Sequence, residues 1–298
     1  MRKRFNSHDY EDVRPWTIAA INDEERFPPD QMWKDEPTAE YIYDERLKRI
    51  TFLQRHSDTH ADAVVLAKRL ESCEQNHRCM SGACPECGRI FQRCFVRRSR
   101  KFIAEHIDNE GRELVVVSIV LNDLMIMPGQ LSKLDIANLQ RRLKYKLKQA
   151  KINVALGGID FSFNEDREGE YQPFWSVHFY LITSTEDKKK LSKKLRKLFL
   201  KSDIVPRPVK ISRFKNTARR LSYALKMNFS RRIGYHEVKN QNGKIRKCRN
   251  ASRDKLRRPE RLELYPYLDK IGLANRVIFW GAKPVVNSSR LKLVKCGP

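Results

Sequence analysis

The stretch Val154–Thr183, VALGGIDFSFNEDREGEYQPFWSVHFYLIT, decides the fold of this chain. Its beginning alternates apolar with polar or small side chains through Ile159, Phe161 and Phe163, which is the period of a β-strand. Its end, 174–183, is rich in aromatic and β-branched residues, and the polar residues between the two ends have the composition of a turn. We therefore expect two neighbouring strands joined by a turn.

Further elements are expected on both sides of this pair. Leu114–Leu121 is β-branched and predicts a buried strand, and Leu131–Ala150 has leucines at helical spacing. Thr185–Leu200 predicts a very basic helix, and Val205–Ser212, with two prolines, predicts an edge strand. The order β-α-β-β-α-β predicts an α+β fold with a ferredoxin-like (split βαβ) antiparallel sheet and helices on one face.

Three parts are expected along the chain. Residues 1–107 predict an N-terminal helical region with a cysteine-rich zinc knuckle at 73–94. Residues 108–232 contain the sheet and end in a helix over Phe214–Phe229. Residues 233–298 predict a basic, mobile arm and then a C-terminal segment with apolar spacing.

The cysteines of the knuckle have metal-ligand spacing. Their pattern is C-x5-C-x4-C-x2-C, formed by Cys73, Cys79, Cys84 and Cys87. Four thiolates so close in sequence usually hold one tetrahedral Zn²⁺, with His77 as a substitute ligand. Such a site is structural because no coordination position stays open, and Cys94 on the following helix is expected in the core. The alternative is a set of unrelated buried thiols.

The charge of the chain points to a polyanionic partner. Lys and Arg number 61 against 36 Asp and Glu, a formal charge of +25, and nucleic acid is the first candidate partner. An acidic membrane surface is the rival, but no apolar run approaches the length of a membrane-spanning helix. Met1–Tyr10 is basic without an apolar segment, so we expect no secretory signal, a cytoplasmic protein and reduced cysteines.

Two side chains of the strand 174–183 are candidates for a second metal site. His178 and Tyr180 share a face of this strand because side chains alternate, and Asp160 on the preceding strand can face His178 across the sheet. A carboxylate and an imidazole together are a partial site for Mg²⁺ or Mn²⁺, with Tyr180 as a third candidate ligand. The alternative is a hydrogen-bonded structural histidine.

The expected helix 214–229 carries a candidate nucleophile. Tyr223 and Lys226 stand at i and i+3, so they are neighbours on one helix face. A tyrosine hydroxyl that attacks a phosphodiester needs deprotonation and charge neutralisation, and a metal ion and an ammonium supply both. The alternative is a tyrosine half packed in the core beside a solvated lysine.

These motifs, in this order, resemble the HUH endonucleases, and more narrowly the rolling-circle replication initiator proteins of bacterial plasmids and phages and their transposase relatives. The resemblance spans about residues 70–230 and rests on the cysteine cluster with Cys84-Pro85-Glu86-Cys87, the strand Val115–Leu121, the acidic strand Gly158–Asp160, the histidine strand Val177–Tyr180 and the Tyr223–Lys226 helix.

The resemblance implies a DNA-nicking activity. It implies that His178 and Asp160 hold a divalent metal ion. Tyr223 would attack the DNA, leaving a 5′-phosphotyrosine and a 3′-hydroxyl, while Lys226 steadies the phosphate. The chain departs from the family's His-x-His pattern because Tyr180 stands at the second position, and a phenol with a pKa of about 10 is a poor ligand for Mg²⁺.

Arginines in two basic regions are the candidate DNA contacts. One region is the run 89–101, and the other is 207–262, where basic residues far outnumber acidic ones. The predicted contacts are Arg97, Arg98, Arg100, Arg219, Arg220, Arg231 and Arg232. The expected partners are single-stranded or hairpin origin DNA and a host replication helicase or polymerase.

Two alternatives to nicking stay open. One is a catalytically impaired, replication-initiator-like DNA-binding protein that acts as a regulator or scaffold, and Tyr180 favours it. The other is a zinc-dependent RNA-binding protein, which would need exposed aromatic side chains at Phe161, Phe163 and Phe179.

Overall fold

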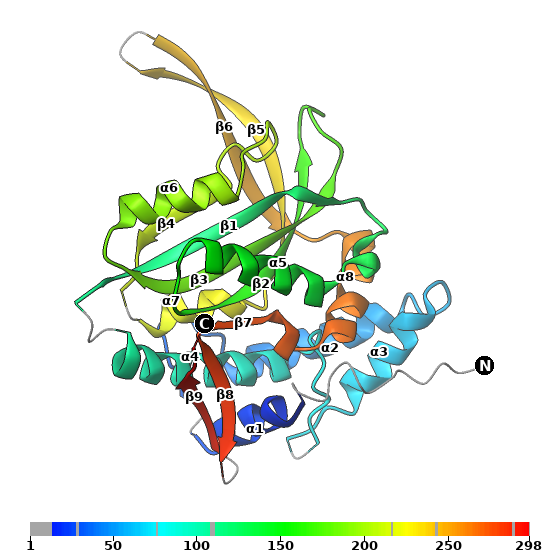
Figure 1. Ribbon diagram of the computed structural model, residues 1–298. Helices are drawn as coiled ribbons and strands as arrows, with labels where there is room; N and C mark the ends of the chain where they lie inside the picture. The colour runs from blue at the N-terminus through cyan, green and yellow to red at the C-terminus, as the bar shows by residue number, and fades with distance from the viewer. Residues whose placement is uncertain are drawn as a thin grey trace.

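The structure is a computed structural model with an α+β architecture, as the sequence predicts, in which helices pack on one large sheet (Figure 1). It describes residues 14–27, 30–75, 77–107, 111–215, 217–241, 244–287 and 290–297. The predicted absence of a secretory signal in Met1–Tyr10 lies outside these residues.

Four strands form the centre of the sheet. They are β1 (Glu113–Ile126), β2 (Ala155–Asp166), β3 (Phe174–Thr185) and β4 (Val209–Arg213). Their order is β4-β1-β3-β2, and each neighbouring pair is antiparallel. The predicted pairing of the two strands in Val154–Thr183 is present, with Asp160 directly opposite His178.

The second edge of β2 is shared by two more strands. β7 (Val277–Trp280) runs antiparallel along its first half, and β5 (Ser230–Gln241) runs parallel along its second half. β5 continues through an antiparallel hairpin into β6 (Lys244–Lys255), which projects from the body in Figure 1. The sheet is therefore mixed, not purely antiparallel. The stretch expected to be a basic, mobile arm forms this hairpin, and its mobility stays a prediction.

Both faces of the sheet are covered. Register partners share a face, so Ile211 of β4 lies on the face of Val117 in β1 and Leu181 in β3. Ile211 borders a groove beside α6 (Lys188–Leu198), and α5 (Ile136–Gln149) lies with α6 in front of the sheet in Figure 1. The opposite face is covered by other helices, described next, which differs from the predicted single helical layer.

The other elements come from the two ends of the chain, from the segment after β4 and, for η3, from the connection between β1 and α5. They are α1 (Arg14–Glu24), α2 (Ala39–Gln54), α3 (Ala61–Glu71), α4 (Pro85–His106), η3 (Leu131–Lys133), α7 (Ala218–Ser222), η4 (Tyr223–Leu225), α8 (Arg258–Ile271), η5 (Ala274–Arg276), β8 (Ala282–Asn287) and β9 (Arg290–Lys295). Trp16 of α1 packs on Phe91 of α4 and Phe279 of β7, with ring centroids 5.3 and 5.8 Å away. All three predicted parts of the chain contribute residues to one contiguous core.

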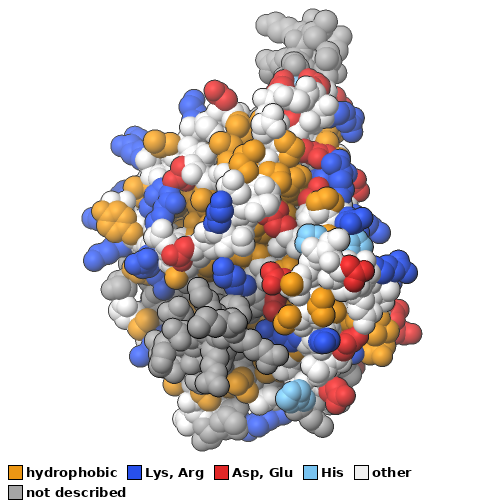
Figure 2. Space-filling model, turned by 90° about the vertical axis from the view of Figure 1, so that its right-hand side faces the viewer, with side chains coloured by type: hydrophobic (Ala, Val, Ile, Leu, Met, Phe, Trp, Pro, Cys, Tyr) orange, Lys and Arg blue, Asp and Glu red, His pale blue; other side chains and the backbone are white. Residues whose placement is uncertain are grey.

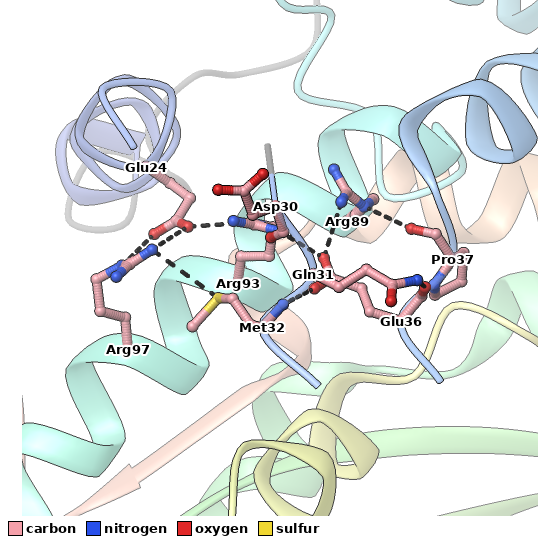
Figure 3. A network of polar contacts seen from close by, with 9 residues as sticks. All are labelled: Glu24, Asp30, Gln31, Met32, Glu36, Pro37, Arg89, Arg93 and Arg97. Atoms are coloured by element: carbon pink, nitrogen blue, oxygen red, sulfur yellow. Dashed lines mark hydrogen bonds and ion pairs between the residues drawn. The ribbon is translucent and has the colours of Figure 1, made fainter. Parts of the chain in front are cut away.

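A buried network of ion pairs fastens the N-terminal segment to α4 (Figure 3). The Glu36 carboxylate, which is fully buried, lies 2.9 Å from Arg93 Nη1 and 3.0 Å from Arg89 Nη2. Glu24 lies 3.1 Å from Arg93 Nε and 3.0 Å from Arg97 Nε. Several arginines of the basic run that begins at Arg89 therefore form ion pairs inside the fold.

Replacing Glu36 with Gln will lower the stability of the protein. The substitution keeps the shape of the side chain but takes a counter-charge away from two buried guanidinium groups, so we expect a loss of about 3 kcal/mol in the free energy of unfolding. Urea denaturation at pH 7 measures the difference. The matched control is Glu45→Gln, which removes a surface ion pair with Lys48 and should cost under about 1 kcal/mol. Equal losses in the two variants would contradict a structural role for the buried network.

Candidate functional site

The four knuckle cysteines converge on one point. Their sulfur atoms lie within 4.8 Å of one another, with Cys73 Sγ at 3.5 Å from Cys87 Sγ and at 3.7 Å from Cys84 Sγ. Four sulfurs bound at about 2.3 Å to one zinc ion stand about 3.8 Å apart, whereas a disulfide needs about 2.0 Å. The cluster can therefore hold one metal ion, and the alternative of unrelated thiols does not describe it.

Contacts between these thiols shift their pKa values. Hydrogen bonds from the neighbouring thiols, Cys79 first, hold the pKa of Cys73 below its ordinary value. Contacts within the cluster, first with Cys73, raise the pKa values of Cys84 and Cys87 well above the ordinary value of a cysteine. A bound cation would favour the thiolate form of Cys84 and Cys87. His77 is exposed and stands outside the cluster, and Cys94 is buried in the core as predicted.

Neighbouring helices hold the backbone of the knuckle. Arg46 Nη1 of α2 donates to the carbonyl oxygen of Cys73 at 2.8 Å, and Arg69 Nε of α3 donates to that of Cys79 at 3.1 Å. Gly82 packs so closely on α8 that a Cβ atom there would lie 2.3 Å from the carbonyl oxygen of Leu268. The positions of the sulfurs are therefore set by contacts from three helices.

The residues of the second predicted site lie on the sheet face that η4 covers. Asp160 and His178 are register partners, and His178 Nε2 lies 3.0 Å from Ser162 Oγ. Burial lowers the pKa of His178 to about 4, so its imidazole is neutral near pH 7 and can act as a metal ligand. Asp160 Oδ1 is buried and makes no hydrogen bond, whereas Oδ2 is 2.8 Å from Lys226 Nζ. This pair leaves one carboxylate oxygen available to a cation.

The candidate nucleophile lies beside this pair, although the local structure differs from the predicted helix. The helix predicted over Phe214–Phe229 is only the short α7 followed by the 3-10 turn η4. Lys226 already has an extended ψ of 142°, and its ammonium turns back to Asp160. Tyr223 is 41% exposed, and Arg253 Nη2 of β6 donates to its hydroxyl at 3.4 Å. The phenol of Tyr223 is therefore accessible and next to two cations.

Tyr180 contacts the candidate nucleophile and is a poor metal ligand. Its ring centroid lies 5.1 Å from that of Tyr223. Burial raises the pKa of Tyr180 to about 12, so its phenol stays protonated near pH 7. The neighbouring candidates for a divalent ion are thus His178 and Asp160, and Tyr180 packs against the ring of Tyr223.

The helix that starts at the cysteine cluster positions the segment of Tyr223. Gln92 Nε2 of α4 donates to the carbonyl oxygen of Ser222 at 2.7 Å, and a Cβ atom at Gly88 would lie 2.1 Å from Met227 Cε. On the sheet side, a Cβ atom at Gly158 would lie 2.1 Å from the carbonyl oxygen of Ala224. Small residues on both sides therefore let the segment lie directly between α4 and β2.

Arg276 is a buried residue of this site that the sequence interpretation missed. Only 1% of it is exposed, and it lies at the fork where β7 and β5 share the edge of β2. Its Nη2 donates to the carbonyl oxygen of Lys226 at 2.8 Å, and its Nε donates to that of Ile159 at 3.3 Å. Burial lowers its pKa to about 10, so it keeps its charge near pH 7. The one signal in the sequence is a lone arginine directly before an apolar strand.

The predicted DNA contacts have different surroundings in the structure. Arg97 and Arg98 form ion pairs with Glu24 and Asp23 of α1, and Arg231 is buried against Asp254. Arg219 lies 2.7 Å from Asp35, Arg220 donates to the carbonyl oxygen of Arg213, and Arg100 is exposed. Arg232 and the unpredicted Arg253 are register partners whose charges act on His178. Contact of these arginines with DNA stays a prediction.

No family model matches this chain, and no curated protein or solved structure matches it. In the part of the chain that the structure describes, no helix is long and apolar enough to cross a membrane. Phe161, Phe163 and Phe179 are buried, so the exposed aromatic side chains that an RNA-binding sheet would need are not there.

Proposed function

We propose that this protein is a metal-dependent, DNA-nicking enzyme of the HUH type, a replication initiator that acts on single-stranded or hairpin origin DNA. The observation that carries the proposal is the meeting of Asp160, His178, Tyr223 and Lys226 on one face of the sheet. The β-α-β-β-α-β order with strands β4-β1-β3-β2 supports a ferredoxin-like sheet. These features agree with the family resemblance of residues 70–230.

The chemistry begins with the phenol of Tyr223. Its oxygen attacks the scissile phosphorus, the Oη–P bond forms and the bond from phosphorus to the 3′ oxygen breaks. The phenol proton passes to water, and the departing oxygen becomes a 3′-hydroxyl. Arg253, which already donates to Tyr223 Oη, stabilises the developing phenolate, and Lys226 neutralises charge at the phosphate.

The residues around Asp160 fit a divalent cation. Asp160 Oδ1, a buried acceptor without a hydrogen bond, and the neutral imidazole of His178 would hold Mg²⁺ or Mn²⁺. When bound, the ion polarises the scissile phosphate. Arg276 donates to the carbonyl oxygens of Lys226 and Ile159, so it holds the segment of Lys226 against the strand of Asp160. We also propose that the cysteine cluster holds structural Zn²⁺.

A second candidate function is DNA binding without cleavage, as a regulator or scaffold. Two observations favour it: the second histidine of the family pattern is replaced by Tyr180, whose phenol stays protonated, and Lys226 occupies one oxygen of Asp160. A protein of this kind would bind DNA with a steep dependence on salt but would leave the strand intact.

DNA labelled at one end distinguishes nicking from binding alone. The protein is incubated with single-stranded DNA from candidate origins and Mn²⁺, and the products are separated on a denaturing gel. A 5′-phosphotyrosine keeps a label at the 3′ end of the DNA on the protein and releases a label at the 5′ end. Mass spectrometry should find the adduct on the peptide that contains Tyr223. Salt-dependent binding with no adduct on any of these DNAs would leave the binding-only function.

A further inference from the structure

The helix α6 is the most concentrated positive charge outside the candidate site. Its sequence, KKKLSKKLRKL, has seven cationic residues among 11, while Leu191 and Leu195 form its buried side. Among the residues that the structure describes, no acidic side chain forms an ion pair with any of these cations. The helix therefore presents a strong positive charge to its surroundings, with Asp187 as an acidic neighbour at its start.

This charge lowers the stability of the helix itself. Lys189, Lys193 and Lys197 follow one another at i+4 spacing, and each like-charged pair costs about 0.2–0.5 kcal/mol. The first turn holds three lysines, Lys188–Lys190, where the helix dipole disfavours positive charge. Asp187 caps the helix by accepting from two backbone N–H groups, which offsets part of that cost. A run of cations with a net cost to folding indicates a role in binding.

Grooves lie on both flanks of α6. One, of about 720 Å³, is lined by residues of α6 that include Lys189, Lys193 and Lys197, and it is bordered by Ile211 of β4. The other, of about 1040 Å³, is lined by Lys190 and Lys194 and also by acidic residues of the preceding turn. The helix is thus a basic ridge whose two rows of lysines face two open spaces.

This ridge lies on the sheet face opposite the candidate nicking site. Ile211, which borders the first groove, shares its face with Leu181, whereas Tyr180 points to the other face with Asp160. On the side of the molecule in Figure 2, Lys and Arg side chains are interspersed with Asp and Glu. The helix α6 differs from this mixed surface because it contains no acidic residue.

We propose that α6 binds the phosphate backbone of duplex DNA. The charge complementarity is strong, since a duplex carries one negative charge per about 1.7 Å of its axis. An 11-residue helix is about 16 Å long, which is the length of about five base pairs. The inference rests on the proposed function in taking DNA as the partner, and it adds a second surface: α6 anchors the duplex beside the origin while the opposite face acts on the single strand.

The test compares two variants with equal loss of charge. In one, Lys189, Lys193 and Lys197 are replaced with Gln; in the control, the exposed Lys34, Lys68 and Lys283 are replaced with Gln. Duplex affinity is measured by fluorescence anisotropy over a series of salt concentrations. Each lost phosphate contact reduces the slope of log K against log salt by about 0.9, so the α6 variant should lose about 2.7 from the slope and bind about 100-fold more weakly at 0.1 M salt. The control should keep the wild-type slope.

The melting temperature and the adduct formation of the α6 variant are also measured. The α6 variant should melt at or above the wild-type temperature, because the substitutions relieve repulsion between lysines, so weaker binding will not come from unfolding. Equal loss of duplex affinity in both variants overturns the proposal. A loss of affinity for vesicles of anionic phospholipid with unchanged duplex affinity also overturns it.

Adduct formation on single-stranded DNA is scored separately: an α6 variant that forms adducts and binds duplex like the control refutes this inference and leaves nicking in place. Selective loss of duplex binding without any adduct supports α6 and removes nicking.

Discussion

Removing the proposed zinc ion from the cysteine cluster is expected to unfold the N-terminal helices and to disorganise the site around Tyr223. The purified protein should contain one zinc ion per chain, and a chelator should lower its melting temperature sharply. Structural zinc sites contribute about 10–16 kcal/mol of apparent folding free energy in small zinc domains. This value is as large as the margin of stability of most domains, which is about 5–15 kcal/mol.

The reach of this effect follows from the position of α4. The helix begins at Cys84 and Cys87, carries Arg93 of the buried ion-pair network, and holds the segment of Tyr223 through Gln92. Loss of the metal ion therefore releases the start of an element that touches both the N-terminal segment and the candidate site. Cys84→Ser should reproduce the effect of the chelator and abolish binding of zinc.

Cys94→Ala is the matched control for the zinc prediction. Cys94 lies on the same helix and is equally buried, but it is outside the cluster. Its replacement should keep one zinc ion per chain and cost about 1 kcal/mol or less, since a small volume is lost. Metal analysis by mass spectrometry and calorimetry with and without chelator decide the matter. Protein that is free of metal as purified, with the same melting temperature in chelator, would refute the zinc assignment.

The central strands were predictable because their side chains are buried on both faces. Phe161 on one face of β2 and Leu156 on the other are fully buried, and such a strand needs the apolar and β-branched residues that the sequence displays. The cysteine cluster was predictable for a different reason: its ligands are close in sequence, so local spacing contains most of the geometry. The facing of Asp160 and His178 follows from the short turn between their strands.

Long-range contacts account for what the sequence did not reveal. The helix predicted over Phe214–Phe229 ends early because Lys226 is drawn to Asp160 by its ammonium and to Arg276 by its carbonyl group, and tertiary contacts override helix propensity. The hairpin β5–β6 has few apolar residues, and its first strand is placed by backbone pairing with β2. Likewise, the partners of Arg97 and Arg98 lie some seventy residues away, where a local count of charge does not find them.

Replacing Tyr223 with Phe is expected to abolish the covalent adduct with DNA. The substitution removes the one oxygen that the proposed mechanism uses as nucleophile, so the rate of adduct formation should fall by about 10⁴-fold or more. DNA affinity should change little, because the ring and its contact with Tyr180 stay in place. Single-turnover assays with Mn²⁺ and DNA labelled at the 3′ end measure the rate, and filter binding measures the affinity.

Two tyrosine variants serve as controls for this loss. Tyr145 is exposed on α5, away from the site, so Tyr145→Phe should react like the wild type. Tyr180→Phe removes a phenol beside the site and should keep the adduct, since Tyr180 is not the nucleophile. An adduct that persists in Tyr223→Phe and disappears in Tyr180→Phe would reverse these roles.

The replacement of Tyr180 by His connects the nucleophile to the metal site. A neutral imidazole is a far better ligand than a protonated phenol, so Tyr180→His should place a second histidine beside His178 and Asp160. The expected result is half-maximal adduct formation at a lower Mn²⁺ concentration than in the wild type, and the double variant with Tyr223→Phe should again form no adduct. A higher nicking rate in Tyr180→His would mean that weak affinity for the cation limits the rate of the wild type. An unchanged dependence on Mn²⁺ would mean that the ion does not contact residue 180.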